Sequence, residues 1–439
     1  MKFSNAIIAL VFLSIFPSCN STVTRSPTDP GINPFTNGGS ERNMIVVISD
    51  IHLGANIAYA EIKNNLSYLE KLLEQIRVAP NVRELVIAGD MLDEWFVPAT
   101  INTYDGKDQN DFVKRIAATN KGVIDAFNKI IQEGNITVTY VPGNHDLTIT
   151  EENVAAILPG INQARDPEQG LGTYSPAGYP EIAIEHGHRY NFFCAPDPLS
   201  NQDIAPGSIL PPGYFYTRIA VLYISQNYPP AGDTVETVTP NQLGGESQHL
   251  AYVYWNIWKK VLQQFPITNK FNDKIIVTNI DGHNETYMLN DLLPYQLSPG
   301  GFIDVRLFKG IQDTWNQRQV LNRVQVNIPV EQAITNSASA TQTNDQARIQ
   351  YFMNPNSNKR LVVFGHTHAA RIDSSLNYLG QKSIYANSGT WIDHNPNLTK
   401  MNFVVITPQN TNNSSQTYVK LYNFEGEVVT QMAVNSLQF

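Results

Sequence analysis

Short apolar runs alternate with longer amphipathic stretches from Met44 onward. Five runs rich in β-branched residues predict strands at 44–49, 84–89, 136–141, 181–186 and 360–365. Between them, residues 61–78 and about 108–133 carry apolar residues at helical spacing. Further apolar runs follow at 383–388, 402–407, 418–424 and 427–434. No helical stretch separates the last three, so the pattern predicts a layered α/β architecture that ends in antiparallel sheet.

The alternation breaks between the runs at 181–186 and 360–365. This region contains Pro- and Gly-rich pieces, an aromatic helical stretch at 246–264 and an Asn/Ser/Thr/Gln-rich span near 335–348. Such a change of pattern indicates an insertion with its own small core. We see no internal repeat.

The N-terminus has the features of an export signal. Lys2 precedes an apolar run at 6–16, which is too short to span a bilayer and is typical of a signal peptide. Cys19 follows, and the segment resembles the lipobox of bacterial lipoproteins, although Phe16 and Pro17 depart from it; an ordinary cleaved signal peptide is the alternative. The polar residues after Cys19 lack apolar periodicity and predict a flexible tether.

Composition excludes some partners. The net charge is −9, with 16% charged residues and no cluster of lysine or arginine, which gives no footprint for nucleic acid or an anionic membrane surface. With Cys19 processed, Cys194 remains alone, so no disulfide can form within the chain. An anionic substrate must therefore be attracted by something other than bulk charge.

Polar clusters follow each of the five regular strands. They are Asp50 and His52; Asp90 and Asp93; Asn144, His145 and Asp146; His186 and His188; and His366 and His368. One such residue after a strand is usually a turn residue or a cap. Because strand carboxyl ends lie along one edge of an α/β sheet, five clusters in succession predict convergence on one crevice.

These side chains offer oxygen and imidazole donors and no thiolate. Such mixtures suit Zn, Fe or Mn. Seven candidate ligands are too many for one ion and suit two, held roughly 3.5–4 Å apart by a bridging carboxylate. Paired ions of this kind stabilise displacement at phosphorus.

Five motifs together resemble the calcineurin-like metallophosphoesterase superfamily. They are D-x-H (50–52), G-D-x-x-D (89–93), G-N-H-D (143–146), H-G-H (186–188) and G-H-T-H (365–368). The resemblance covers about 44–190 and 360–407. Within the superfamily, the wording "SDIHLG", "GDMLDEW", "EHGHRY" and "NSGTW" is similar to the UDP-2,3-diacylglucosamine hydrolase branch.

The resemblance implies a four-layer αββα sandwich with a two-metal site at the sheet edge. Together with the N-terminal features and the break in the pattern, it divides the chain into a signal peptide (1–18), a flexible tether (19–42), a metallophosphoesterase domain (43–190 and 359–439) and an insertion or cap region (191–358). It also implies ligand roles: Asp50, His52, Asp90 and His368 for one ion, and Asp90, Asn144, His186 and His366 for the other.

The remaining motif residues have other implied roles. His145, held by a carboxylate such as Asp146, would face the scissile phosphate as proton donor or charge stabiliser. Asp93 would orient a ligand or a loop, and His188 would contact substrate or serve as a structural neighbour. The implied activity is hydrolysis of a phosphoester or pyrophosphate by a water activated between two divalent ions.

The substrate stays open, because the relatives of that branch act inside the cell whereas this chain carries an export signal and a larger insertion. The expected partners are a phosphorylated small molecule or a lipid-linked substrate, and a membrane reached through lipidated Cys19, in the periplasm or at the outer-membrane surface. The alternatives are a phosphomonoesterase acting on small phosphates or nucleotides, and a non-catalytic metal-binding lipoprotein. We expect the insertion to form a cap that selects the substrate, with Tyr252, Tyr254, Trp255 and Trp258 as stacking surface or as its core. Three further histidines, His249, His283 and His394, lie outside the motifs; the first two are interpreted as structural or solvated, and His394 as a residue that could reach the pocket.

Overall fold

The computed structural model describes residues 33–439 apart from 338, 340–342, 397, 410–413 and 426–427. The predicted signal peptide and Cys19 therefore lie outside the described residues. The chain divides into two compact units. Unit 1 takes in the chain up to Asp93 together with 113–188 and 339–439, and unit 2 consists of 94–112 and 189–338. Unit 2 thus includes most of the region interpreted as an insertion and adds 94–112.

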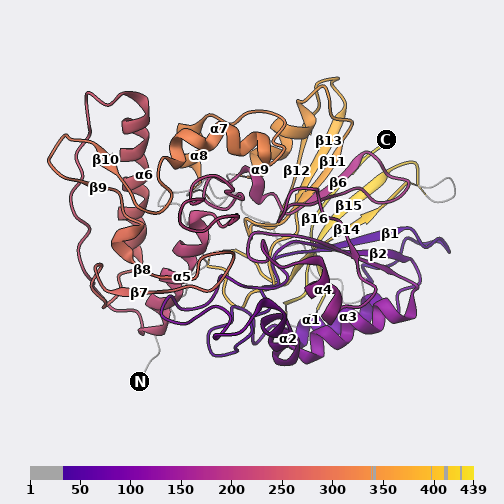
Figure 1. Ribbon diagram of the computed structural model, residues 1–439. Helices are drawn as coiled ribbons and strands as arrows, with labels where there is room; N and C mark the ends of the chain where they lie inside the picture. The colour runs from indigo at the N-terminus through magenta and orange to yellow at the C-terminus, as the bar shows by residue number, and fades with distance from the viewer. Residues whose placement is uncertain (1–32, 338, 340–342, 397, 410–413, 426–427) are drawn as a thin grey trace. The chain divides into compact units, whose positions relative to one another are not determined.

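Unit 1 contains a seven-stranded sheet in the order β16-β15-β14-β1-β2-β3-β4 (Figure 1). Its strands are β1 (Met44–Ile48), β2 (Val82–Ala88), β3 (Thr137–Val141), β4 (Asn162–Gln163), β14 (Asn402–Thr407), β15 (Thr417–Asn423) and β16 (Thr430–Leu437). β1 to β4 pair in parallel, whereas β14, β15 and β16 pair antiparallel, and β14 joins β1 antiparallel. The C-terminal strands are therefore antiparallel, as their pattern predicts.

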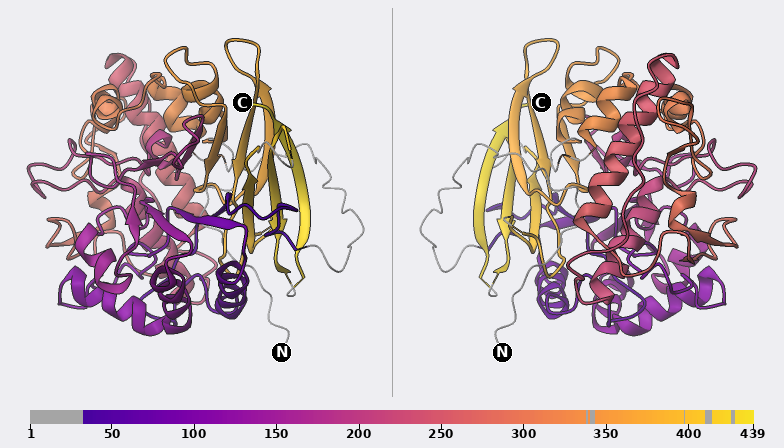
Figure 2. Two further views of the ribbon diagram at one scale, coloured as in Figure 1. Left: turned by 90° about the vertical axis from the view of Figure 1, so that its right-hand side faces the viewer. Right: turned by 90° about the vertical axis from the view of Figure 1, so that its left-hand side faces the viewer.

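The second sheet of unit 1 has the order β12-β13-β11-β6-β5. Its strands are β5 (Thr173–Tyr174), β6 (Ile182–Glu185), β11 (Leu361–Phe364), β12 (Arg371–Leu376) and β13 (Lys382–Asn387). β6, β11 and β13 run parallel, and the two edge strands are antiparallel. Figure 2 shows the late strands of both sheets, in orange and yellow, running side by side.

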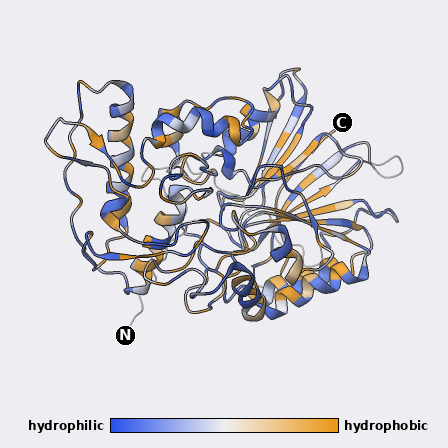
Figure 3. Cartoon of the chain, in the orientation of Figure 1, coloured by the Kyte–Doolittle hydropathy of each residue, from blue (hydrophilic) through white to orange (hydrophobic). Residues whose placement is uncertain are grey.

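The core of unit 1 lies between the two sheets. Alternate residues such as Ile45 of β1 and Ile182 of β6 share one buried cluster, to which most strands of both sheets contribute. Val46, on the opposite face of β1, is also fully buried. Because β1 is covered on both faces, it reads as a continuous apolar run rather than an alternating one (Figure 3).

Helices cover the outer faces of these sheets. α1 (Leu66–Arg77) packs on α3 (Lys121–Glu133), which also contacts β3; each buries one apolar stripe. On the second sheet, η3 (Ala347–Phe352) follows α9 (Asn344–Gln346) and contacts β13. This αββα arrangement confirms the predicted fold class.

Two local predictions need correction. The helical stretch at 108–133 is two helices, α2 (Gln109–Thr119) and α3, because the Asn120 side chain bonds the Gly54 and Ile116 carbonyls between them. Residues 33–42 of the predicted tether also contact the domain. Phe35 is 2% exposed and stacks on Phe403. Hydrogen bonds also hold this segment, because the Asn81 side chain donates to the Gly39 and Glu41 carbonyls and the Arg42 side chain donates to the Val82 carbonyl.

Unit 2 has a core of its own built largely from aromatic rings. Its helices are α5 (Pro212–Ser225), α6 (Gly245–Gln264), α7 (Ile311–Leu321) and α8 (Val330–Asn336), with the hairpins β7–β8 (Lys274–Val277, Thr286–Met288) and β9–β10 (Tyr295–Gln296, Ile303–Asp304). Tyr254 stacks on Phe193 with centroids 5.7 Å apart, and Trp255 and Trp258 are also buried. These rings therefore pack in the core of unit 2, whereas Tyr252 is partly exposed.

Two elements lie at or near the points in the sequence where the chain passes from one unit to the other. They are η1 (His188–Tyr190) and α2, whereas α4 (Glu151–Ile157) belongs to unit 1. Across the described part of the chain, no helix combines the length and apolar content needed to cross a bilayer.

Candidate metal centre

The polar clusters predicted at strand ends meet at the carboxyl edges of both sheets. Asp50, Asp90 and Asn144 follow β1, β2 and β3, which are parallel neighbours in the first sheet. His186 and His366 follow β6 and β11, which are parallel neighbours in the second. The structure therefore draws one site from two sheets, and all of its residues belong to unit 1.

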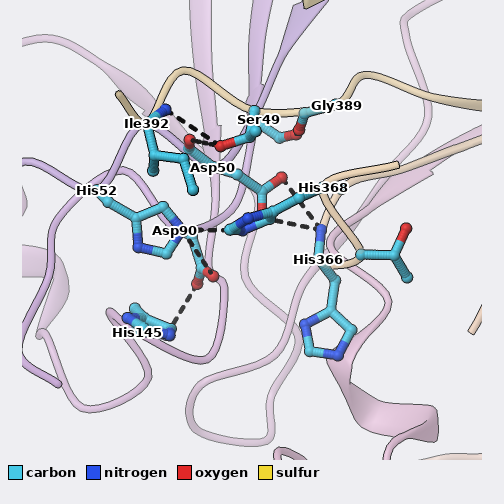
Figure 4. Close-up of polar contacts among 12 residues, drawn as sticks. Ser49, Asp50, His52, Asp90, His145, His366, His368, Gly389 and Ile392 are labelled. Atoms are coloured by element: carbon cyan, nitrogen blue, oxygen red, sulfur yellow. Dashed lines mark hydrogen bonds and ion pairs between the residues drawn. The ribbon is translucent and has the colours of Figure 1, made fainter. Parts of the chain in front are cut away.

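One set of side chains gathers around Asp50. His52 Nε2 lies 3.2 Å from His368 Nε2, and His368 Nε2 lies 3.2 Å from Asp50 Oδ1 (Figure 4). Two nitrogens bound to one ion at about 2.0–2.1 Å lie roughly 3.0–3.4 Å apart in tetrahedral or octahedral geometry. The spacing of the two Nε2 atoms therefore fits ligands of a shared ion.

A second set gathers around Asn144. Its Oδ1 lies 3.1 Å from His186 Nε2 and 2.8 Å from His366 Nδ1. The His186 Nδ1 atom lies 2.9 Å from the Ala88 carbonyl, to which it donates, so Nε2 is the ring nitrogen that faces the set. Two imidazoles and an amide oxygen again form a group of donors that an ion could share.

Asp90 lies between the two sets. Its Oδ2 is 3.1 Å from His186 Nε2 and 3.7 Å from His52 Nε2. Its Oδ1 accepts the backbone N–H of His145 at 2.8 Å. One carboxylate oxygen thus faces a nitrogen from each set.

The electrostatics of the centre also favour cations. Asp50 and Asp90 are buried close to each other, and although burial opposes it, the neighbouring histidines hold the pKa of both carboxyls below the usual value. Burial lowers the pKa of His186, but the carboxylates of Asp90 and Asp50 outweigh it and raise that pKa to about 9. Burial and the His186 charge lower the pKa of His366 to about 3. In the described residues, the groups whose spacing suits a metal include Asp50, His52 and His368, and also Asp50, Asp90 and His186.

The backbone of the centre is held in an uncommon conformation. Five of the candidate ligands have left-handed φ: Asp50 (52°), His52 (55°), Asp90 (50°), His366 (69°) and His368 (56°). Non-glycine residues in this region cost on the order of 1–3 kcal/mol each and persist where the surroundings fix them. The Asp50 carboxylate supplies one such restraint, because it accepts the His366 N–H at 3.0 Å. This backbone conformation thus recurs where the donors converge.

Two glycines of the motifs are required by close approach. A Cβ on Gly89 would lie 2.3 Å from His186 Nδ1, and a Cβ on Gly143 would lie 2.2 Å from Asp90 Oδ1. Gly89 also has a φ of +86°, which a side chain would make costly. These glycines let the ligand-bearing turns approach each other.

The carboxylate that contacts His145 is Asp93, which corrects the sequence-based assignment to Asp146. Asp93 Oδ1 lies 2.8 Å from His145 Nδ1. Asp146 instead accepts the backbone N–H groups of Gly143 at 2.6 Å and Met91 at 2.8 Å. It therefore ties the turn after β3 to the turn after β2, a long-range role that adjacency in sequence does not reveal.

Sequence reasoning missed Glu61, whose Oε2 lies 3.1 Å from His52 Nδ1. No motif surrounds Glu61, so the sequence offers no signal for it. His188 Nε2 lies 3.0 Å from the Gly170 carbonyl, which gives this residue a structural contact. His283 is buried against Phe215 in unit 2.

The other two histidines outside the motifs are exposed. His249 lies 3.4 Å from Glu331 in unit 2. His394 is partly shielded from solvent, and this partial desolvation lowers its pKa.

The family comparison agrees with this centre. Residues 44–370 match a family described as calcineurin-like phosphoesterase, and because the match spans well over half of the chain, the chain belongs to this family. A search of curated proteins finds no match. Among solved structures, the crystal structure of the nuclease MPE from Pseudomonas putida is similar over 32% of this chain and 53% of that chain, at 21% identity and a TM-score of 0.20. The similarity thus spans about half of the nuclease's length.

Family and site together give a calcineurin-like phosphoesterase domain whose donor groups are spaced to hold metal ions. The UDP-2,3-diacylglucosamine hydrolase branch stays a prediction, as do the individual ligand roles.

Proposed function

We propose that this protein hydrolyses a phosphoester or pyrophosphate bond with two divalent transition-metal ions, of Mn, Fe or Zn. The observation that carries the proposal is the position of Asp90 Oδ2 between His52 Nε2 and His186 Nε2. One set would consist of Asp50, His52, Asp90 and His368, and the other of Asp90, Asn144, His186 and His366. Bound ions would lower the pKa of water and offset the negative charge of phosphoryl oxygens.

The chain itself supplies orientation and a proton. Asp93 engages His145 Nδ1, and Asp90 Oδ1 accepts the His145 N–H, so both backbone and ring of His145 are fixed from opposite sides. Burial lowers the pKa of His145, but the charges of Asp93 and Asp90 outweigh it and hold that pKa above the usual value. In its protonated form the imidazole can donate a proton from Nε2 to a leaving oxygen. We assign this role to His145.

Retention of the full donor set supports an enzyme over a binding scaffold. A scaffold would be expected to lose ligands or the histidine at 145, and here all seven candidate ligands and His145 are present. The substrate itself is not inherited with the motifs, because the region at 191–358 and the N-terminal export signal differ from the expected intracellular branch.

The decisive experiment compares rates on a chromogenic monoester, a chromogenic diester and UDP- or CDP-linked substrates, together with elemental analysis of the same sample. We expect close to two ions per chain and metal-dependent turnover, with the highest rate on a diester or pyrophosphate identifying a phosphodiesterase or pyrophosphatase. Highest turnover on the monoester would instead identify a phosphomonoesterase. Active protein with one ion or none would contradict the two-metal assignment.

We further propose that the protein is exported and anchored through a lipid on Cys19. The support is the apolar run at 6–16 followed by a cysteine and a polar segment. Replacing Cys19 by alanine should move the protein from the detergent phase to the aqueous phase with its catalysis intact. Unchanged partitioning would exclude an anchor at that residue.

A further inference from the structure

His52 is contacted by two carboxylates on the ring side opposite His368. Its Nδ1 lies 3.0 Å from Asp93 Oδ2 and 3.1 Å from Glu61 Oε2, while its Nε2 faces His368. All three side chains are buried, with Glu61 only 5% exposed and the other two 1%. Glu61 is therefore built into the interior of the site rather than placed at its surface.

The two carboxylates do not have equivalent duties. Asp93 is shared, because its Oδ2 faces His52 while its Oδ1 holds His145. Glu61 contacts His52 through its Oε2 atom. A carboxylate on the far nitrogen of a metal-binding imidazole fixes the ring and increases its basicity. With Glu61 present, the orientation of His52 does not depend on Asp93 alone.

A separate loop fixes the backbone of Glu61. The Asp393 N–H donates to the Glu61 carbonyl at 2.9 Å. The Asp393 carboxylate accepts the backbone N–H groups of Lys63, Asn64 and Asn65 at 3.0–3.2 Å. In the same loop, Thr390 Oγ1 donates to the Asp50 carbonyl at 2.9 Å. One loop thus sets the positions of both Asp50 and the segment that carries Glu61.

We propose that Glu61 is a positioning residue for the ion held by His52, placed there by the Asp393 loop. The proposal rests on the two-metal function above. The two ions should respond differently. Loss of the Glu61 carboxylate should weaken the binding of the ion held by the His52 set and leave the binding of the ion held by the Asn144 set unchanged. Since the His145 contact with Asp93 is retained, excess metal should restore turnover.

The experiment titrates metal-stripped protein with Mn²⁺ by calorimetry and compares Glu61→Ala, Glu61→Gln and the control Glu70→Ala. Glu70 is a carboxylate of the adjacent helix α1 that lines an outer groove with Lys129 of α3. We expect one binding step of Glu61→Ala to weaken by about 10–100-fold, and the other step to stay unchanged. Glu61→Gln keeps an acceptor oxygen and should lose about tenfold in the same step; it decides the test if the alanine variant does not fold. Glu70→Ala should bind as the unmodified protein does.

The possible outcomes distinguish failure of the Glu61 role from failure of the two-metal function. Fewer than two ions on the unmodified protein would contradict the proposed function itself. Two ions on the unmodified protein with both steps unaffected in the Glu61 variants, or both weakened equally, would overturn the positioning role. A third ion that disappears in Glu61→Ala would also overturn it, because Glu61, Asp93, His52 and His145 would then be ligands rather than supports.

Discussion

Gly143→Ala is a sharp test of the geometry around Asp90. The added Cβ would lie 2.2 Å from Asp90 Oδ1 and 2.3 Å from the Asp90 backbone nitrogen, whereas ordinary contact begins at 3.4 Å. Asp90 cannot rotate away, because its backbone nitrogen is also obstructed and its carboxylate holds the His145 N–H. The turn must therefore shift by roughly 1 Å, and a misplacement of that size can cost on the order of 10²-fold in rate, or about 2.7 kcal/mol. We expect reduced metal content as well, since the displaced carboxylate is the proposed bridge.

A matched control is available in α3. A Cβ on Gly122 would lie 2.1 Å from Glu70 Oε1, an equally short contact, but with the end of a flexible and partly exposed side chain. Glu70 can move aside, and alanine is the better helix former by about 0.5–1 kcal/mol. Gly122→Ala should therefore keep activity and full metal content. The assay is turnover of a chromogenic diester, with elemental analysis and thermal unfolding on the same samples. Gly143→Ala with the turnover and metal content of the unmodified protein would refute the inference that Gly143 sets the position of Asp90.

Three further predictions follow from the centre and its supports. His145→Asn should lower turnover by about 10²-fold or more with metal content unchanged, whereas Asp90→Asn should remove metal and activity together; loss of metal in His145→Asn would show that its role is misassigned. In the metal-free protein the pKa of His186 is about 9, so an ion must displace a proton from this side chain. The metal affinity should therefore rise with pH, by up to about tenfold per unit from pH 6 towards 9. An affinity that chelator competition shows to be independent of pH would contradict this. Asp393→Asn removes the charge that caps the segment before α1 and should lower the melting temperature by a few degrees, at a cost of about 1–2 kcal/mol; an unchanged melting temperature would show that this cap does not contribute.

The fold class and the meeting of the motif residues were predictable because both depend on local pattern. A run such as 44–49 is buried on both faces, and its apolar continuity is visible in the sequence. The polar residues after each strand needed only the rule that parallel strands share a carboxyl edge. The split at Asn120 was not predictable, because it depends on a side-chain bond to Gly54, 66 positions away.

The supports of the centre were less predictable than its candidate ligands. Asp146 is adjacent to His145 in sequence, yet its carboxylate turns back to the Gly143 and Met91 N–H groups. Asp93 reaches His145 across 52 positions. Glu61 depends on a loop more than 300 positions away, and no periodicity of the chain encodes such a contact.

The origin of the site in two sheets has a consequence for how the protein should come apart. Asp50 and His368 are separated by most of the chain, and their side chains meet at one edge of the interface between the sheets. Ions bound there would link the two sheets of the sandwich at that edge. Ligand linkage alone would add about 2.7 kcal/mol for each ion present at a hundredfold excess over its dissociation constant. Removing the ions with a chelator should therefore make the interface between the sheets accessible to proteases before the outer helices unfold. The concentration of available metal would then determine the lifetime of the protein as well as its activity.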